Sequence, residues 1–587
     1  MMSIEKIDEI VKSINKSFSA KLNKGYIELL GSTSNYDEIL KAISKSKYKS
    51  YSVSSNIKLE GLNTSSPNIP LNDYSLDNLK VDCLIVGGGI IGLSILRELS
   101  KYKLNSILIE MDNDINRRES SRINGSISSG IDSRHFPIKT MYIVKGNKEL
   151  KKTLMELEVP FEECGEIFLL KGKSEKMIYP FIKSISNRLG ISNISYISKE
   201  ELKNRLSESL EFFDGGFFLK DNIRTNPFLY ALSLAENAID NGAVISLNTK
   251  VLDIKVEDGL IKSVKTNRGT IYPKIVINAN GLYSDEIAML SHDKSFSILP
   301  IKNTEIVLDK RLSNKINESI TSFPLEYESS RMKAISKIKK ILSDKGEITN
   351  NKSVRISKLS SGNIVVSLPG VMTPKKDDNM VDDNVFNFIK YIRDKKILDI
   401  SRNDIISYNV YTSFKIDSFD FLIRRGIDTK NIIEVIVDNN LISSSISISK
   451  DVKDWVIDFL ESTGEKVLDN KSFNPHHTSL KRLKDYPISL VNKMIKSNPK
   501  YGKVVCTCQN ISEGEINDAL NTTFPSFTID GLRRRLDREF SLCNGAYCTC
   551  HLMEIIKNKK GIDPSMILKS SLDSNIIYNK PKEEDSL

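Results

Sequence analysis

The segment "VDCLIVGGGIIG", residues 81–92, predicts a short apolar strand, a glycine turn and a helix that continues to about Lys103. Gly87, Gly89 and Gly92 have the G-x-G-x-x-G spacing. In this pattern the first glycine makes the tight turn, and the second lets backbone amides approach a pyrophosphate. The third lets the helix pack against the strand, so that the helix N-terminus faces the phosphate charge. The segment therefore indicates a nucleotide-binding unit.

Two later segments support this interpretation. "SILIE" (106–110) predicts a second strand that ends in Glu110, 18 residues after Gly92, where a carboxylate can bind a ribose hydroxyl. The small polar loop "RRESSRINGSISSG" (117–130) follows and would lie across the dinucleotide. A further strand, 274–278, ends in "ANG" (279–281), which would bring its backbone close to the same ligand.

Length and composition limit the class of protein. A chain of 587 residues is too long for one core, so several domains are expected. A hydrophobic fraction of 40% indicates a globular protein, no apolar run is long enough for a membrane span, and the N-terminus lacks a signal peptide. We therefore expect a cytoplasmic protein, or one held at a membrane through a partner. The net charge of +10 is scattered rather than gathered in a patch, which argues against nucleic-acid binding.

The predicted elements divide the chain into a module at 1–78, a central part at 79–495 and a C-terminal part at 496–587. The module should have the order helix (4–22), strand (26–30), helix (36–44) and strand (51–59), and it resembles a BON-like binding module. An uncharacterised α+β appendage is the alternative. In the central part we expect a β-rich region at 296–425, a solvated helix at 331–345, two strands around a turn at 407–426 and a helix at 451–462.

The central motifs resemble a known family. "CLIVGGGIIGLSILRELSK", the strand ending in Glu110, "INGSISSGI" and "VINANGLYSDEIA" are similar to the FAD-dependent D-amino-acid oxidase and glycerol-3-phosphate dehydrogenase superfamily. The patterns are nearest to its L-2-hydroxyglutarate oxidase and anaerobic glycerol-3-phosphate dehydrogenase branches. The resemblance covers about residues 81–460 and implies FAD as cofactor. It implies these FAD-binding residues: Gly87, Gly89, Gly92 and Glu110 at the adenosine diphosphate half, Ser120 and Ser121 near the pyrophosphate, Val251 beside adenine, and Ala279 and Gly281 in the last turn.

The chain departs from the family pattern around the substrate. Ser128 stands where the family has a histidine, and a hydroxyl is a poor base near neutral pH without help. The family's substrate-binding arginine should fall near 410–413, where no arginine occurs, and its "SPGLT" loop is "SSSIS" (443–447) here. Arg134, His135 and Lys139 follow the polar loop and could supply a cation and a base. The alternative for each of the three is a surface charge.

The cysteines are concentrated near the C-terminus. Five of the seven fall within the last hundred residues, which favours a metal site over a disulfide framework. Cys506 and Cys508 form a C-x-C pair, and Cys543 and Cys548 form a C-x4-C pair. Four thiolates from two tight loops suit zinc or iron–sulfur. Predicted helices at 513–520 and 529–540 would bring the two pairs together.

The sequence around these cysteines resembles the bacterioferritin-associated-ferredoxin-like domain. This domain is fused at the same place in the A subunit of anaerobic glycerol-3-phosphate dehydrogenase. The resemblance implies a 2Fe–2S cluster on Cys506, Cys508, Cys543 and Cys548, with zinc as the alternative. Cys550 is a further thiol outside the pattern.

These observations predict an α/β fold: an FAD-binding Rossmann-like domain, an interleaved β-rich substrate domain, the small N-terminal α+β module and a small helical domain with four cysteines. The expected activity is FAD-dependent oxidation of a small anionic secondary alcohol, glycerol 3-phosphate first. Electrons would pass through the cluster to a second redox subunit or a quinone-linked acceptor. The alternatives are an electron-transfer or scaffold subunit with a degenerate substrate site, or a 2-hydroxyglutarate or amino-acid dehydrogenase.

Overall fold

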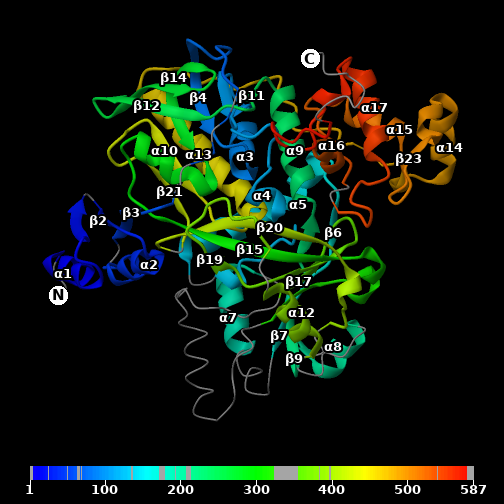
Figure 1. The fold of residues 1–587 in the computed structure, drawn as a ribbon, viewed down its shortest axis with the longest axis horizontal. Coiled ribbons are helices and arrows are strands. Elements are labelled where there is room, and N and C mark those ends of the chain that lie inside the picture. Colours follow the sequence, from blue (N-terminus) through cyan, green and yellow to red (C-terminus); the bar gives the residue numbers. More distant parts are fainter. Residues whose placement is uncertain are drawn as a thin grey trace, which may run out of the picture.

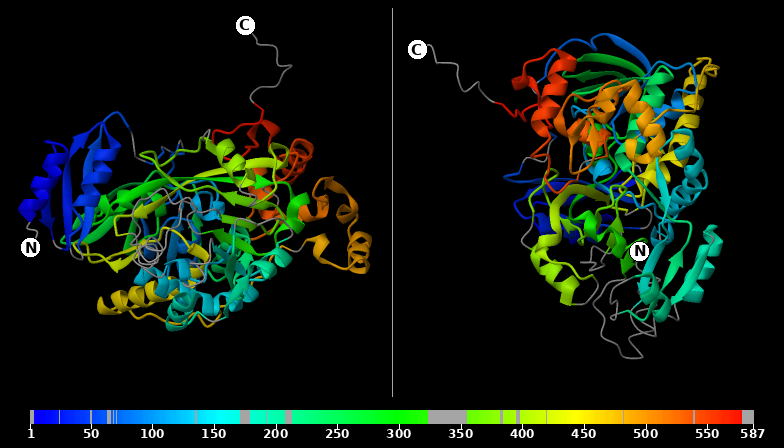
Figure 2. Two further views of the ribbon diagram at one scale, coloured as in Figure 1. Left: turned by 90° about the horizontal axis from the view of Figure 1, so that it is seen from below. Right: turned by 90° about the vertical axis from the view of Figure 1, so that its right-hand side faces the viewer.

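The computed structural model describes residues 4–577, apart from 24, 49–50, 63–65, 68, 70, 134–135, 171–178, 192, 207–212, 323–354, 382–383, 395–397, 419, 481 and 538–539. The predicted helix at 331–345 lies outside the described residues. The N-terminal module and the C-terminal domain lie at opposite ends of the long axis, with the two large sheets between them (Figures 1 and 2). Among the residues described above, no helix combines the length and apolar character needed to cross a membrane.

The nucleotide-binding sheet contains the glycine motif. Its parallel strands pair in the order β11, β5, β4 and β14, with β22 parallel to β14 on its other side. Side chains alternate between two buried clusters: Cys83 and Ile85 face the helices, whereas Leu84 and Val86 face the opposite layer. Burial on both faces explains why these strands read as continuous apolar runs. The strands are β4 (Leu79–Val86), β5 (Ser106–Ile109), β11 (Val244–Ser246), β12 (Val251–Glu257), β13 (Leu260–Thr266), β14 (Gly269–Asn278), β21 (Leu422–Arg425) and β22 (Ile432–Ile436).

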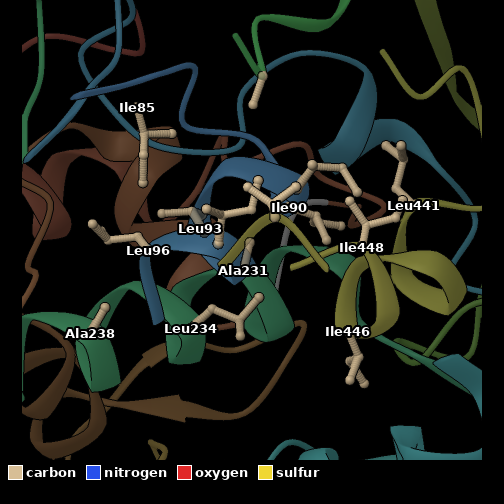
Figure 3. Close-up of a cluster of buried hydrophobic side chains, with 14 of the residues drawn as sticks. Ile85, Ile90, Leu93, Leu96, Ala231, Leu234, Ala238, Leu441, Ile446 and Ile448 are labelled. Atoms are coloured by element: carbon tan, nitrogen blue, oxygen red, sulfur yellow. The ribbon is translucent and has the colours of Figure 1, made fainter. Parts of the chain in front are cut away.

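Helices α3 (Ile90–Leu99), α5 (Pro137–Glu156), α9 (Pro227–Asp240) and α13 (Leu441–Ser462) form the main core with this sheet. Side chains of α3, α9 and α13 interdigitate there (Figure 3). The sequence predicted that α13 begins at 451, ten residues too late, because the "SSSIS" segment (443–447) resembled a loop. In the structure these serines lie inside α13 and are buried. The hydroxyls of Ser444, Ser445 and Ser447 bond to carbonyls one turn back, as Ser445 Oγ does to Ile442 O at 3.0 Å, whereas Ser443 Oγ donates to Ser128 O at 3.4 Å.

The second large sheet forms the β-rich domain. Its strands run in the order β19, β15, β18, β17, β16, β7, β9 and β8, and β20 pairs with β15 along its whole length. The bounds are β7 (Glu166–Leu170), β8 (Ile194–Ser198), β9 (Gly215–Leu219), β15 (Ile298–Leu308), β16 (Ser319–Ser322), β17 (Arg355–Lys358), β18 (Ile364–Ser367), β19 (Val371–Met372) and β20 (Ile405–Ile416). The flanking helices are α7 (Tyr179–Leu189), α8 (Lys199–Arg205) and α12 (Asn384–Asp394), and a short pair, β6 (Phe161–Glu163) and β10 (Ile223–Thr225), joins the domains.

The N-terminal module contains α1 (Ile4–Ile14), β1 (Ser19–Asn23), β2 (Tyr26–Thr33), α2 (Tyr36–Lys45) and β3 (Ser52–Leu59). The predicted helix at 4–22 was too long, because residues 19–23 pair with β2 as a hairpin that turns at Gly25. The module packs on the β-rich domain through Leu299 of β15, and the Asp417 carboxylate accepts from Val53 N at 2.6 Å. The likeness to a BON-like module and the boundary at 78 stay predictions.

The C-terminal domain is a small helical unit with its own core. It contains α14 (Ile488–Ser497), the hairpin β23 (Val504–Cys506) and β24 (Ile511–Ser512), α15 (Glu513–Ala519), α16 (Ile529–Arg535) and α17 (Thr549–Lys560). Helix α16 is shorter than predicted, ending at Arg535. Leu480 already packs against this core, upstream of the predicted boundary at 495.

Candidate functional site

The glycine loop closes the C-terminal edge of the nucleotide-binding sheet. Gly87 has φ +113°, and a Cβ there would lie 2.4 Å from Ala279 O. A Cβ on Gly92 would lie 2.0 Å from Gly87 O, so the start of α3 packs directly on the turn. Gly89 is the N-cap of α3, and its Cβ position meets only Ser120 Oγ, at 3.2 Å. Bare backbone amides at a helix N-terminus therefore face the adjoining cleft.

Glu110 lies at the end of β5 beside this loop. Its Oε2 accepts a hydrogen bond from Gly88 N at 2.6 Å, and its Oε1 accepts from Asp112 N at 2.9 Å. Burial, and then the charge of Asp112, raise the pKa of the Glu110 carboxyl to about 7. A carboxylate next to the glycine loop is the partner that a ribose hydroxyl requires.

The cleft between these elements is lined by most of the residues that the sequence assigned to the cofactor. Gly87, Gly89, Glu110, Ser120, Ala279 and Gly281 all contribute to its wall. Ser121 is turned away, because its hydroxyl donates to Arg118 O at 3.0 Å. Val251 begins β12 and packs in the core behind the sheet. The roles of individual residues toward FAD stay predictions.

Two cleft residues were missed by the sequence interpretation. Arg117 and Arg118 line the same cleft, and Arg118 binds both oxygens of Asp112, at 2.9 and 3.2 Å. The Arg118 guanidinium also lies 5.3 Å from the centre of the Tyr283 ring. The signal was the pair of arginines that begins the small polar loop. Cations, bare amides and a carboxylate together fit a dinucleotide, so the residues present can hold FAD.

A larger cavity of about 670 Å³ opens beside the cleft, between the β-rich sheet and the N-terminus of α13. Lys415 and Asp438 line its wall and belong to a charge cluster that Lys139 completes from behind the wall: Lys139 Nζ lies 2.7 Å from Asp438 Oδ1, and Lys415 Nζ lies 2.6 Å from Asp438 Oδ2. Lys139 and Asp438 are each 2% exposed, so the surface-charge alternative is wrong for Lys139. Burial lowers the pKa of Lys139, whereas the charge of Asp438 opposes that shift. Two lysines therefore contact one buried carboxylate beside the cavity.

Lys415 is a cation close to residues 410–413, the range that contains no arginine. It lies on β20, two residues beyond that range, and lines the cavity. A second cation, Arg355 at the start of β17, lines the same cavity and is 48% exposed, with its nearest carboxylate, Asp132, at 3.8 Å. Neither residue belongs to a local motif. The cavity therefore presents two cations where an anionic substrate could bind.

Ser128 lies in an adjoining small pocket with Asp132 and Arg355. Its hydroxyl donates to Asp132 Oδ1 at 2.7 Å and accepts from Gly130 N at 3.0 Å. Arg134 and His135 lie outside the described residues. The catalytic roles of Ser128, Arg134, His135 and Lys139 stay predictions.

Glu119 stands where the cleft and the cavity meet, at the start of the short helix α4 (Glu119–Arg122). Burial, and then the charge of Asp438, raise the pKa of its carboxyl well above the usual value.

The four predicted metal-binding cysteines come together in the C-terminal domain. Cys508 Sγ lies 3.6 Å from the sulfurs of both Cys506 and Cys543. A thiol hydrogen bond with Cys506, and further the charge of Arg533, lower the pKa of Cys548 to about 7. Within the part of the chain that the structure describes, however, no group of three or more His, Cys, Asp or Glu side chains has the arrangement that could hold a metal ion. The sulfur contacts suit a shared centre, whereas a metal or cluster there stays a proposal.

Comparison with known proteins agrees with this geometry. The family described as "FAD dependent oxidoreductase" (DAO) matches residues 82–333. A glycerol 3-phosphate dehydrogenase from Caloramator mitchellensis is 27% identical over 507 residues, which cover 86% of this chain and 99% of that protein. A glycerol 3-phosphate oxidase from Mycoplasma genitalium is 25% identical, over 60% of this chain and 88% of its own.

Solved structures show the same fold. L-alpha-glycerophosphate oxidase from Mycoplasma pneumoniae, with FAD bound, superposes with a TM-score of 0.58 at 20% identity, over 68% of this chain and 98% of its own. Glycerol-3-phosphate dehydrogenase from Bacillus halodurans, also with FAD, gives a TM-score of 0.56 at 13% identity, over 83% of this chain and 92% of its own. The α/β fold and the FAD-binding domain predicted from the sequence are thereby confirmed. Residues 82–333 therefore form an FAD-dependent oxidoreductase domain of the DAO family.

Proposed function

We propose that the protein is an FAD-dependent dehydrogenase that oxidises glycerol 3-phosphate to dihydroxyacetone phosphate. The observation that carries the proposal is the pair of cations, Lys415 and Arg355, in the wall of a cavity that adjoins the dinucleotide cleft. A small phosphate ester needs such a cation in a partly closed site. The relative from Caloramator mitchellensis, similar over 86% of this chain, supports this substrate.

In the proposed reaction the secondary alcohol loses a hydride from carbon and a proton from oxygen, and the C–O bond becomes a carbonyl. FAD, when bound, accepts the hydride, and the protein supplies orientation and charge. Lys415 and Arg355 would hold the phosphate group, while Lys139 keeps Asp438 and Lys415 in place. Ser128 would position the substrate. Arg134 and His135 stay candidates for the cation and the base.

We further propose that Cys506, Cys508, Cys543 and Cys548 hold a 2Fe–2S cluster, with zinc as the alternative. The sulfur contacts of Cys508, at 3.6 Å, support a shared centre. Such a cluster carries single electrons, so it would connect the dehydrogenase site to a second redox subunit or a quinone-linked acceptor.

An anaerobic absorbance titration of the purified protein tests the substrate. Glycerol 3-phosphate should bleach the flavin bands, whereas 2-hydroxyglutarate and amino acids should not. If 2-hydroxyglutarate alone bleaches them, the protein belongs with the L-2-hydroxyglutarate dehydrogenases, one of which, from Indibacter alkaliphilus, is 24% identical over 41% of this chain. Unchanged bands across the whole panel would instead support an electron-transfer subunit with a degenerate site.

Elemental analysis tests the cysteine site separately. We expect about two irons per chain, as a 2Fe–2S cluster requires. Cys508→Ser should abolish iron binding because Cys508 contacts two of the other three thiols. Cys550→Ser is the matched control and should retain the iron, because Cys550 is exposed and outside the pattern. Stoichiometric zinc in place of iron would refute the cluster without affecting the flavin result.

A further inference from the structure

Residues 112–118 connect the dinucleotide cleft to the C-terminal cysteine domain. On the cleft side, Asn116 N donates to Gly88 O of the glycine loop at 2.9 Å. Ile115, which precedes Asn116, is completely buried in the core with α3 and α9. The segment therefore has little freedom to move independently of the glycine loop.

On its other side the segment is held by a buried ion cluster. Asp114, 2% exposed, accepts hydrogen bonds from Arg535 at 2.9 and 3.0 Å and from Arg534 at 2.8 Å. Both arginines belong to α16, which packs beside α9 (Figure 1). Burial alone would raise the pKa of Asp114, but Arg535 and then Arg534 lower it to about 2. A bidentate arginine–carboxylate pair in a buried setting fixes both partners in one geometry.

A second set of contacts holds Arg117, which lines the cleft. Arg117 Nη2 donates to Ser570 Oγ at 3.0 Å, and its Nη1 donates to Asn113 Oδ1 at 2.5 Å. Asn113 Nδ2 in turn donates to Ser570 O at 2.7 Å. Ser570 belongs to the C-terminal domain, so this domain determines where a cleft-lining cation lies.

We infer that the C-terminal cysteine domain is part of the FAD site: it holds residues 112–118 through Asp114 and Ser570 and thereby sets the affinity for FAD. Asp114, Asn113 and Ser570 are positioning residues, which act through Arg117 and the glycine loop. Coupling between two sites is reciprocal. If the docked domain strengthens FAD binding by a given factor, bound FAD must strengthen the docking of the domain by the same factor. The inference rests on FAD as cofactor and on neither the substrate nor the metal.

The test uses the full-length chain, stripped of flavin and titrated with FAD. Asn113→Ala removes the hydrogen bond to Ser570 O and one of the acceptors of Arg117 without burying a charge. Asp114→Asn removes the carboxylate from two buried arginines. Both changes should raise the dissociation constant for FAD, within the roughly 5- to 150-fold range of typical coupling between sites, and Asp114→Asn should have the larger effect.

Thr523→Ala is the matched control. Thr523 Oγ1 donates to Asp240 Oδ1 of α9 at 2.9 Å, so this bond also crosses between the domains but does not involve residues 112–118. It should leave the affinity for FAD unchanged. An equal loss of affinity in Thr523→Ala and Asn113→Ala would overturn the inference, because any loosening of the domain would then suffice.

Hydrogen exchange supplies a readout that a purely structural role would not change. Adding FAD to the wild-type apoprotein should slow amide exchange in α16, and Asn113→Ala should reduce that protection. If Asp114→Asn does not fold, Asn113→Ala alone decides the question. Unchanged affinity for FAD together with unchanged exchange in α16 would overturn the inference. Failure of glycerol 3-phosphate to bleach the flavin would refute only the proposed substrate.

Discussion

The dinucleotide cleft and the neighbouring cavity adjoin each other but are built in opposite ways. The cleft is formed by loops that follow parallel strands β4, β5 and β14 at one edge of a sheet, and the backbone of its glycines shapes much of its wall. The cavity takes single side chains from distant segments, such as Arg355, Lys415 and Asp438, and charge would supply the specificity that we propose for it. A backbone site depends on local residue types and therefore shows as a motif, whereas a side-chain site depends on tertiary contacts.

The largest expected effect is in the glycine loop. Gly92→Ala should give a flavin-free, destabilised protein, because the new Cβ would lie 2.0 Å from Gly87 O, a backbone atom that cannot move aside. Overpacking of this kind costs about 1–3 kcal/mol even where the surroundings can adjust. Flavin content after purification and the midpoint of thermal unfolding measure the two consequences.

Gly89→Ala is the matched control for the fold. Gly89 has φ −79°, which alanine adopts freely, and its Cβ would meet only the Ser120 hydroxyl. We expect normal unfolding but weaker binding of FAD, since the methyl group would occupy the approach to the pyrophosphate. If Gly92→Ala and Gly89→Ala both retained flavin, FAD binding would not depend on the backbone of the glycine loop.

The next effect is confined to the cavity. Lys415→Met should lower kcat/KM for glycerol 3-phosphate roughly ten- to hundredfold, since a hydrogen bond to a charged group contributes about 1.5–3 kcal/mol. FAD affinity should not change, because Lys415 lines the cavity and not the glycine loop. Lys151→Met, which removes an exposed pair with Glu163 at 2.8 Å, should leave kinetics and flavin content unaltered. A loss of flavin in Lys415→Met would show that cleft and cavity do not act separately.

A third effect concerns pH and the cleft. Because the pKa of Glu110 is raised to about 7, the ionised fraction of its carboxyl falls as the pH drops below that value. A ribose hydroxyl donates best to the ionised form, so the affinity for FAD should fall by up to about tenfold per pH unit below pH 7. Fluorescence titrations from pH 5.5 to 8, roughly centred on that pKa, measure the slope. Glu110→Gln should bind FAD more weakly but without this pH dependence, and a slope that persists in Glu110→Gln would assign the titration to another group.

The same contrast explains what the sequence could predict. Gly87, Glu110 and Ala279 line one cleft, and the sequence could bring them together because strand, turn and helix patterns specify their positions within a few residues. Lys415 was missed because only the pairing of β20 with β15 brings it to the cavity, and the segment around it resembled no motif. Lys139 looked like a surface charge because its partner, Asp438, is about three hundred residues away in the sequence. The start of α13 was predicted too late because its first turns are rich in serine, which a hydropathy pattern reads as polar and exposed. In the structure these serines are buried, and their hydroxyls are hydrogen-bonded inside the protein.

The smallest expected effect is at Ser128, where the resembled family has a histidine. Its hydroxyl already donates to Asp132 and lies in a side pocket, so Ser128→Ala should lower kcat by less than about fivefold, far below the loss expected for a general base. Asp132→Asn should behave similarly if the pair only orients substrate. A loss of a hundredfold or more in both variants would make Ser128 and Asp132 a catalytic dyad. The pocket beside the cavity would then contain a base that replaces the family's imidazole. Because Ser128 and Asp132 are four residues apart in the sequence, this base, like the glycine loop of the cleft, would be determined by a short segment.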